Sequence, residues 1–285
     1  MSASRTAQYI ALYRALETNE PGRAPLFRDP FARSFLPRSL QFAVGVSRSR
    51  VMRAALVRYA DHRAPGARTS AIARTAFLDD AARAAVARGI SQIVILGAGF
   101  DCRAHRLPEL ANATVFEVDR ADTQAVKRER VRGGRADVRY VAVDFLRDDT
   151  AARLAAAGWD KTRPTFFVWE GVTNYLTEAA VARVLAWVGT LPAPSTIAFT
   201  YIHRGVLDGT GRFQGAAKMV ENVARLGEPW SFGIEPTELP AFLARAGLVL
   251  REDVGADEYR VRYLGAGDHA GYAFYRIAVA AVAAG

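Results

Sequence analysis

The sequence has only one cysteine, Cys102, and therefore cannot form an intramolecular disulfide or a zinc site made of several cysteines. It also lacks any apolar run that reaches the ~18 residues of a membrane-spanning helix. Near the N-terminus, Arg14 interrupts the apolar stretch, so this segment is a poor signal peptide. From these features we expect a cytoplasmic protein that holds no metal ion and has no membrane partner.

Lysine is scarce as well, since Lys127, Lys161 and Lys218 are the only lysines among 38 basic residues. The net charge of +9 would by itself favour an acidic partner such as nucleic acid. However, the arginines are scattered along the chain and accompany abundant alanine, a composition that G+C-rich coding sequences tend to produce. No basic block interleaved with aromatic residues is present, and we expect no nucleic-acid partner.

The length of 285 residues and the 51% share of hydrophobic residues are sufficient for one large domain with an appended layer. Residues 1–90 contain helical stretches that prolines and glycines separate, and they show no clear strands. The clearest helix is predicted over residues 73–88, where apolar residues recur at helical spacing and Gly89 follows as a C-cap. We therefore predict a helical N-terminal cap layer over residues 1–90 and a second unit over residues 91–285.

Strands and helices alternate in the second unit. Strands are predicted at residues 92–96, 114–118, 139–143, 165–169 and 196–200, and helices at residues 103–111, 121–132, 150–157 and 178–188. This order predicts an α/β fold with a doubly wound, parallel, Rossmann-like sheet. In such sheets the ligand lies at the carboxyl ends of the strands.

The alternation breaks after residue 200. Residues 201–232 contain several glycines and a helical stretch at 216–226, and this segment is too long for an ordinary loop. We predict that it is an insertion that covers the site. A helix at residues 238–245 and two strands at 248–251 and 273–279 follow, and we expect the two strands to form a hairpin at the sheet edge.

Two glycines and a carboxylate indicate a nucleoside-containing ligand. Gly97 and Gly99 follow the first buried strand, and Asp119 ends the second at the spacing from which a carboxylate reaches ribose hydroxyls. Cys102 stands where a dinucleotide site needs a small residue, and Asp101 would repel a pyrophosphate. These residues disfavour NAD and FAD, and they favour S-adenosylmethionine, which has a ribose and an adenine but no phosphate.

The motifs together resemble those of the leucine carboxyl methyltransferase family, which includes bacterial natural-product O-methyltransferases. The resemblance covers the chain from about residue 6 to its C-terminus. The segments that carry it are residues 96–107, 116–119, 143–145 and 170–176, with the upstream segment 74–80 and, before it, Thr6, residues 14–17 and residues 29–30. Cys102 departs from the family pattern, which usually has threonine at this position.

The resemblance implies a class I methyltransferase fold, with seven strands of which the last is antiparallel, and S-adenosylmethionine as the cofactor. Arg74 would bind the cofactor carboxylate, Asp144 and Phe145 would contact adenine, and Glu170 would lie near the cationic end. The complete set of expected cofactor-binding residues is Arg74, Gly97, Gly99, Asp119, Asp144, Phe145 and Glu170.

The methyl acceptor is less defined. We expect a carboxylate or a hydroxyl of a small, acidic or aromatic molecule of secondary metabolism. A hydroxyl needs a general base, for which the candidates are Tyr201, His203 and Tyr175, while Arg204 and Arg212 could orient an acidic acceptor. Methylation of a protein C-terminal carboxylate and non-catalytic cofactor binding remain alternatives, and the sequence leaves the oligomeric state open.

Overall fold

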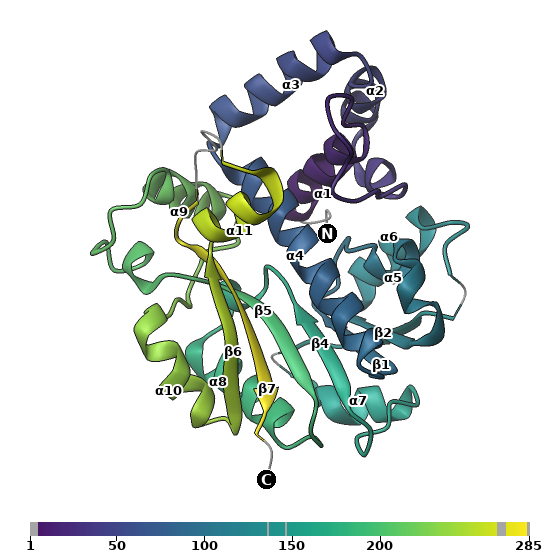
Figure 1. Cartoon of the computed structure of the whole chain (residues 1–285), viewed down its shortest axis with the longest axis vertical. Coiled ribbons are helices and arrows are strands. Elements are labelled where there is room, and N and C mark those ends of the chain that lie inside the picture. The colour runs from purple at the N-terminus through teal and green to yellow at the C-terminus, as the bar shows by residue number, and fades with distance from the viewer. Residues whose placement is uncertain (1–4, 136, 146, 267–271, 284–285) are drawn as a thin grey trace.

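The computed structural model describes residues 5–135, 137–145, 147–266 and 272–283, and its centre is a seven-stranded sheet (Figure 1). The strand order is β3-β2-β1-β4-β5-β7-β6. All neighbouring pairs are parallel except those of β7, which runs antiparallel to both β5 and β6. The strands are β1 (Gln92–Leu96), β2 (Thr114–Asp119), β3 (Arg139–Ala142), β4 (Thr165–Trp169), β5 (Thr196–Ile202), β6 (Leu248–Gly255) and β7 (Tyr275–Val282). The predicted seven-stranded, mostly parallel sheet is confirmed.

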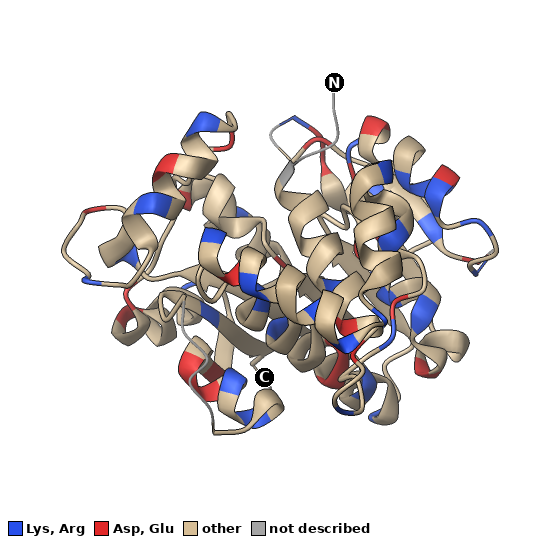
Figure 2. Cartoon of the chain, turned by 90° about the horizontal axis from the view of Figure 1, so that it is seen from above, with Lys and Arg blue, Asp and Glu red and all other residues tan. Residues whose placement is uncertain are grey.

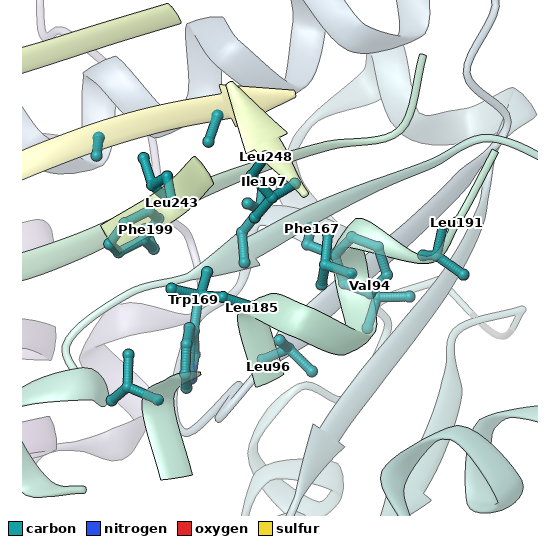
Figure 3. Close-up of a cluster of buried hydrophobic side chains, with 14 of the residues drawn as sticks. Val94, Leu96, Phe167, Trp169, Leu185, Leu191, Ile197, Phe199, Leu243 and Leu248 are labelled. Carbon is teal, nitrogen blue, oxygen red and sulfur yellow. The ribbon is translucent and has the colours of Figure 1, made fainter. Parts of the chain in front are cut away.

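Helices cover both faces of this sheet. One face packs against α7 (Thr150–Ala156), α8 (Glu178–Gly189) and α10 (Leu239–Ala244). The other face packs against α4 (Ala67–Ala87), α5 (Arg103–Arg106), α6 (Ala121–Arg130) and α11 (Ala256–Leu264). Figure 3 shows the core of the first face, where Leu185 and Leu243 from helices meet strand residues such as Phe167 and Ile197.

The strand sequences explain this double burial. Every residue of β1 and β4 is buried, as expected for continuous apolar runs in the middle of a parallel sheet. Successive side chains alternate between the two faces. Val94 and Leu96 thus belong to the core beside α8, whereas Ile93 and Ile95 belong to the core beside α4.

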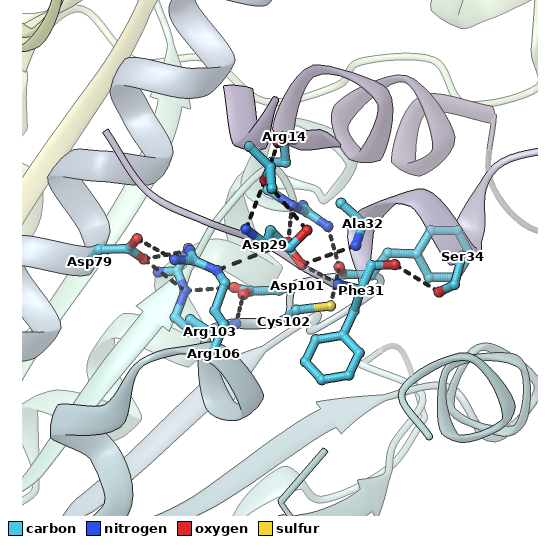
Figure 4. Close-up of polar contacts among 12 residues, drawn as sticks. Arg14, Asp29, Phe31, Ala32, Ser34, Asp79, Asp101, Cys102, Arg103 and Arg106 are labelled. Carbon is cyan, nitrogen blue, oxygen red and sulfur yellow. Dashed lines mark hydrogen bonds and ion pairs between the residues drawn. The ribbon is translucent and has the colours of Figure 1, made fainter. Parts of the chain in front are cut away.

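The N-terminal layer consists of α1 (Arg5–Thr18), α2 (Arg38–Val46) and α3 (Arg50–Arg63), with a short 3₁₀ helix at Ala32–Phe35. A buried ion pair, with 2.9 Å between Nε of Arg14 and Oδ2 of Asp29, lies at its base (Figure 4). The same arginine donates to the carbonyl of Phe100, which follows β1. Apolar residues of α1 also pack against Phe100 and Cys102. The layer is therefore fixed directly to the loop after β1.

Two local predictions need correction. The helix expected over residues 103–111 is only α5, followed by a 3₁₀ helix at Pro108–Asn112. Leu107 has an extended conformation, because a residue that precedes proline is disfavoured in the helical region. The strands β6 and β7 pair antiparallel as expected, but they do not form a simple hairpin, because α11 lies between them in the chain.

Basic and acidic residues are interspersed over the helices in the view of Figure 2. This distribution agrees with the scattered arginines of the sequence. In the described parts of the chain, no helix has both the length and the apolar character needed to span a membrane.

Candidate functional site

A cavity of about 1510 Å³ opens at the carboxyl ends of the parallel strands. Its floor is formed by the residues that follow β1, β2 and β4, and its walls come from α1, α3, α4 and the segment 219–231. A typical small-molecule site has a volume of ~300–1,000 Å³, so this cavity has room for two ligands side by side. Most of the lining residues are apolar or aromatic, and the charged ones lie partly at the strand ends and partly on the helical walls.

Gly97, Gly99 and Asp119 form one end of this cavity. The backbone of Gly97 has a φ of +65°, and a Cβ atom there would lie 2.4 Å from Cγ2 of Val172. The N–H of Gly99 donates to Oδ2 of Asp119 at 2.6 Å, and the N–H of Arg120 donates to Oδ1 at 2.7 Å. These contacts hold the carboxylate in a fixed orientation at the end of β2.

Burial raises the pKa of the Asp119 carboxyl above its usual range, and the two backbone amides oppose this rise. A buried carboxylate with oriented oxygens is well suited to accept hydrogen bonds from a pair of hydroxyl groups. The strand end therefore has the geometry that a ribose requires.

Glu170 follows β4 and lies between two arginines. Its Oε1 accepts from Nε of Arg74 at 2.9 Å, and its Oε2 accepts from a guanidinium nitrogen of Arg103 at 2.9 Å. The guanidinium of Arg74 also lies 4.5 Å from the ring centroid of Tyr275, an arrangement that favours the cation. Arg74 and Glu170 thus place one positive and one negative side chain at the cavity wall, with Arg103 buried behind them, which suits a ligand that carries both an anionic and a cationic group.

This cluster continues beneath the cavity into a network of ion pairs (Figure 4). Arg103 lies 2.8 Å from Asp101, and Arg106 makes a bidentate contact with Asp79 at 2.7 and 2.8 Å. These side chains are almost fully buried, and each charge has a partner of opposite sign. Removing one partner from such a network leaves an uncompensated buried charge, so the network fixes α4 and α5 around the site.

A second polar group lies where the N-terminal layer meets the segment after α9 (Ala216–Arg225). Gly227, with a φ of +75°, ends α9, and the N–H of Glu228 donates to the carbonyl of Val223 at 2.9 Å. This C-cap directs the chain back toward β4. The hydroxyl of Thr6 on α1 then donates to Oε2 of Glu228 at 2.8 Å.

Tyr175 and Trp230 line the cavity beside this carboxylate. Burial, followed by the neighbouring Tyr275, raises the pKa of the Tyr175 phenol to about 12, while the nearby Trp230 and Thr6 oppose the rise. The phenol therefore keeps its proton near neutral pH. The cavity thus contains a hydrogen-bonding phenol and a carboxylate, Glu228, at the end formed by α1 and the segment after α9.

Comparison with protein families places this geometry in context. Residues 7–189 match the model of the leucine carboxyl methyltransferase family, which is more than half of the chain. The chain belongs to this family. The membership confirms the resemblance that the sequence motifs indicated, and the match covers the N-terminal layer from residue 7 as well as the first four strands.

Named relatives are similar to this chain over most of their length. A protein of Frankia alni, named as an S-adenosyl-L-methionine-dependent methyltransferase, is 39% identical over 217 residues, which cover 74% of this chain and 72% of that protein. A protein of Streptomyces avermitilis with the same kind of name is 37% identical over 217 residues, or 72% of this chain and 71% of that one.

Solved structures show the same fold at lower identity. A DUF574 family protein from Streptomyces avermitilis superposes with a TM-score of 0.63 at 17% identity, over 99% of this chain and 98% of the other. A structure from Thermobifida fusca, described as that of a methyltransferase, gives a TM-score of 0.61 at 19% identity, over 96% and 94%. These likenesses support the class I methyltransferase fold of this family member.

The structure brings most of the predicted cofactor residues to the cavity, but not all of them. The predicted residues that line it are Arg74, Gly97, Gly99, Asp119, Glu170 and Tyr175. Asp144 and Phe145 follow β3 at the edge of the sheet, and they are not among the described residues that line the cavity. Phe145 packs instead against the core beside α8.

Tyr201 requires a correction as a candidate base. Its side chain belongs to the same core as those of Ile197 and Phe199, beside α8 and α10, and it is not among the described residues that line the cavity. Its hydroxyl is held by Asp253 at 2.9 Å and by Arg276 at 3.0 Å. This position gives Tyr201 a structural role between β5, β6 and β7.

His203 also lies outside the lining of the cavity. Its Nδ1 accepts from the N–H of Gly205 at 3.0 Å, and its Nε2 lies 3.0 Å from Glu235. The arginines of the same segment are equally remote: Arg204 pairs with Glu238 at 2.6 Å on the surface, and Arg212 is exposed. The structure therefore does not support these residues as a base or as acceptor ligands at this cavity.

Sequence reasoning missed Glu228, Trp230 and Tyr275 as lining residues, together with the contribution of α3. The signal for Glu228 was present, because an acidic residue directly follows a glycine at the end of a predicted helix in the insertion. The direction of its side chain depends on the C-cap and on the contact with Thr6, which spacing along the chain does not encode.

Proposed function

We propose that this protein is an S-adenosylmethionine-dependent O-methyltransferase that acts on a hydroxyl group of a small, largely apolar acceptor. The observation that supports the proposal is that two groups of residues with different chemistry line the same cavity. The strand-end cluster of Gly97, Gly99 and Asp119 suits the methyl donor, and Glu228 with Tyr175 provides the groups that an acceptor hydroxyl needs.

The residues at the strand ends fit S-adenosylmethionine as the methyl donor. Asp119 is oriented to accept from ribose hydroxyls, and Gly99 leaves the backbone open to a close ligand, whereas the space beside Gly97 holds the side chain of Val172. Arg74 and Glu170 offer charges of both signs for the amino and carboxylate groups of a methionine moiety. When bound, S-adenosylmethionine supplies an electrophilic methyl group on a sulfonium, and the names of the relatives agree with this donor.

The acceptor end favours a hydroxyl over a carboxylate. A carboxylate acceptor would be repelled by Glu228, whereas a hydroxyl donates a hydrogen bond to it. Thr6 occupies one oxygen of Glu228, so the second oxygen can receive the proton that the hydroxyl loses. Tyr175, which stays protonated, can donate to the acceptor oxygen and orient it, while the apolar walls exclude water.

Arg74→Ala should weaken the binding of S-adenosylhomocysteine far more than that of adenosine, because adenosine lacks the carboxylate that this arginine would hold. Isothermal titration calorimetry with both ligands measures the difference. Arg83→Ala, which removes a half-exposed arginine from the same helix, is the matched control. Equal losses for the two ligands in Arg74→Ala would assign this residue a structural role only.

The test of the function is the product formed from 6-hydroxy-2-naphthoate, which offers a hydroxyl and a carboxylate on one apolar molecule. With labelled S-adenosylmethionine, we expect the base-stable methyl ether, identified by mass spectrometry before and after saponification. A saponifiable methyl ester as the main product would contradict hydroxyl methylation. Turnover of a peptide C-terminus in preference to hydroxylated aromatics would favour the protein-directed alternative instead.

A further inference from the structure

A second, smaller cavity of about 320 Å³ lies beside the main one, between the C-terminal end of α3 and α9. Its lining consists of four exposed basic side chains and one half-buried amide: His62, Arg63, Lys218, Arg225 and Asn222. We call this group the cationic subsite. Arg63, Asn222 and Arg225 line both cavities, so the subsite is continuous with the main cavity.

The charges of the cationic subsite are poorly compensated within the described chain. Arg225 pairs with Glu221 one helical turn earlier. Asp61, which precedes His62, forms an ion pair with Arg68, whose guanidinium nitrogens lie 3.0 and 2.8 Å from the two carboxylate oxygens. The described residues place no carboxylate within ion-pair distance of Arg63 or Lys218, and Glu228 in the main cavity contacts Thr6.

This concentration of positive charge comes from two distant parts of the sequence. His62 and Arg63 belong to the N-terminal layer, whereas Lys218 and Arg225 belong to the helix in the segment after β5. Solvent screens the repulsion between these exposed side chains, but together they keep a positive potential at the rim of the main cavity. The arrangement is therefore suited to an anion that is present when the main cavity is occupied.

The region of the main cavity next to the subsite is apolar. Leu56 and Tyr59 on α3 and Met219 on α9 line it, and Tyr59 is largely exposed. A ligand that extends from Glu228 to the cationic subsite would thus have a hydroxyl at one end, an apolar middle and an anionic group at the other. Each of these three groups would then lie next to cavity residues of complementary chemistry.

We propose that the cationic subsite binds a carboxylate or phosphate group of the methyl acceptor, at a distance from the hydroxyl that is methylated. The proposal rests on the proposed function, since it concerns the acceptor of the same reaction. It also relocates the acceptor-binding cations that the sequence suggested at Arg204 and Arg212, which lie elsewhere.

The first test uses inorganic pyrophosphate as the probe, so that it does not depend on the length of the acceptor. Calorimetry should give a dissociation constant of about 1 mM or lower for the full chain. The double variant Arg63→Glu, Lys218→Glu should weaken this binding about 10-fold or more, because it reverses two of the charges. Arg58→Glu makes one such charge reversal on an exposed residue of α3 outside the subsite, and it should bind pyrophosphate nearly as wild type does.

Absence of pyrophosphate binding to the wild-type chain would overturn the proposal, as would equal binding by the double variant. If the charge reversal disturbs folding, the neutral pair Arg63→Gln, Lys218→Gln replaces it with the same expected direction. S-adenosylhomocysteine binding is measured on each protein. If the wild-type chain does not bind S-adenosylhomocysteine, the proposed function is contradicted. If it binds S-adenosylhomocysteine but not pyrophosphate, only the proposed subsite is contradicted.

A second test compares 12-hydroxydodecanoate with 1,12-dodecanediol in the presence of S-adenosylhomocysteine. The two flexible molecules differ only in the terminal carboxylate. We expect the acid to bind about 10-fold more tightly or better, and the advantage to disappear in the double variant. Equal affinities for the acid and the diol would show that the subsite does not recognise a carboxylate and would restrict the proposal to phosphate.

Discussion

Asp119→Ala should weaken the binding of S-adenosylhomocysteine by about 1–3 kcal/mol, because a buried charged acceptor of hydrogen bonds is lost. Calorimetry on the purified variant measures this loss. Asp119 is the residue in which sequence and structure agree most closely, since its oxygens are held by the amides of Gly99 and Arg120 at the cavity. Unchanged affinity would move the donor away from the end of β2.

Two controls sharpen this result. Asp137→Ala removes an exposed carboxylate that pairs with Arg135, and it should leave the affinity unchanged. The second control is pH. Burial, as the largest influence, raises the pKa of Asp119, and a proton removes the charge that the hydroxyl groups of the ligand need. Affinity should therefore fall as the pH is lowered, starting at a higher pH than for an ordinary aspartate, and Asp119→Asn should lack this dependence.

The agreement between sequence and structure is greatest where local patterns determine the outcome. The strands β1 and β4 have the bounds that their apolar runs predicted, because a run buried on both faces leaves little choice of register or direction. The turn with Gly97 and Gly99 and the carboxylate of Asp119 were also found from the sequence. Each of these features depends on residues that are close together in the chain.

The errors arise where a side chain could point in more than one direction. Tyr201 lies near the end of β5, but the alternation of the strand places its side chain in the core of one sheet face, where its hydroxyl contacts Asp253 and Arg276. His203 contacts Glu235, and Arg204 pairs with Glu238. Both carboxylates come about thirty residues later in the chain. Such pairings depend on tertiary structure, so proximity to a strand end was not sufficient to identify them.

The same limit explains the residues that the sequence did not reveal. The cavity needs α3 and α9 to lie side by side, and nothing in the local pattern of either helix specifies the other. Glu228 is brought to Tyr175 by contacts of the following segment, in which the N–H and the hydroxyl of Ser231 donate to the carbonyls of Asn174 and Leu176 at 2.8 Å. The acceptor end is therefore a property of the assembled fold.

Glu228→Gln should lower kcat by about 10²–10⁴-fold with a hydroxyl acceptor, the usual contribution of a general base. The amide keeps the shape of the side chain and its contact with Thr6, but it cannot take up the proton. The affinity for S-adenosylhomocysteine should stay unchanged, since the donor contacts lie at the other end of the cavity. Steady-state kinetics with 6-hydroxy-2-naphthoate, together with calorimetry, separates the two effects.

A change of acceptor distinguishes a base from a residue that only positions the acceptor. In Glu228→Gln the loss of kcat should be large with an acceptor whose hydroxyl keeps its proton at the assay pH, and small with an acidic phenol that is already ionised there. Tyr175→Phe should lower the rate with both acceptors through poorer orientation, since burial holds that phenol protonated with a pKa of about 12. Glu252→Gln, a change at a half-exposed residue that pairs with Arg262 on α11, is the control and should leave both rates unaltered. An equal loss of kcat with the two acceptors in Glu228→Gln would exclude this carboxylate as the base and favour a carboxylate acceptor, which needs no proton removal.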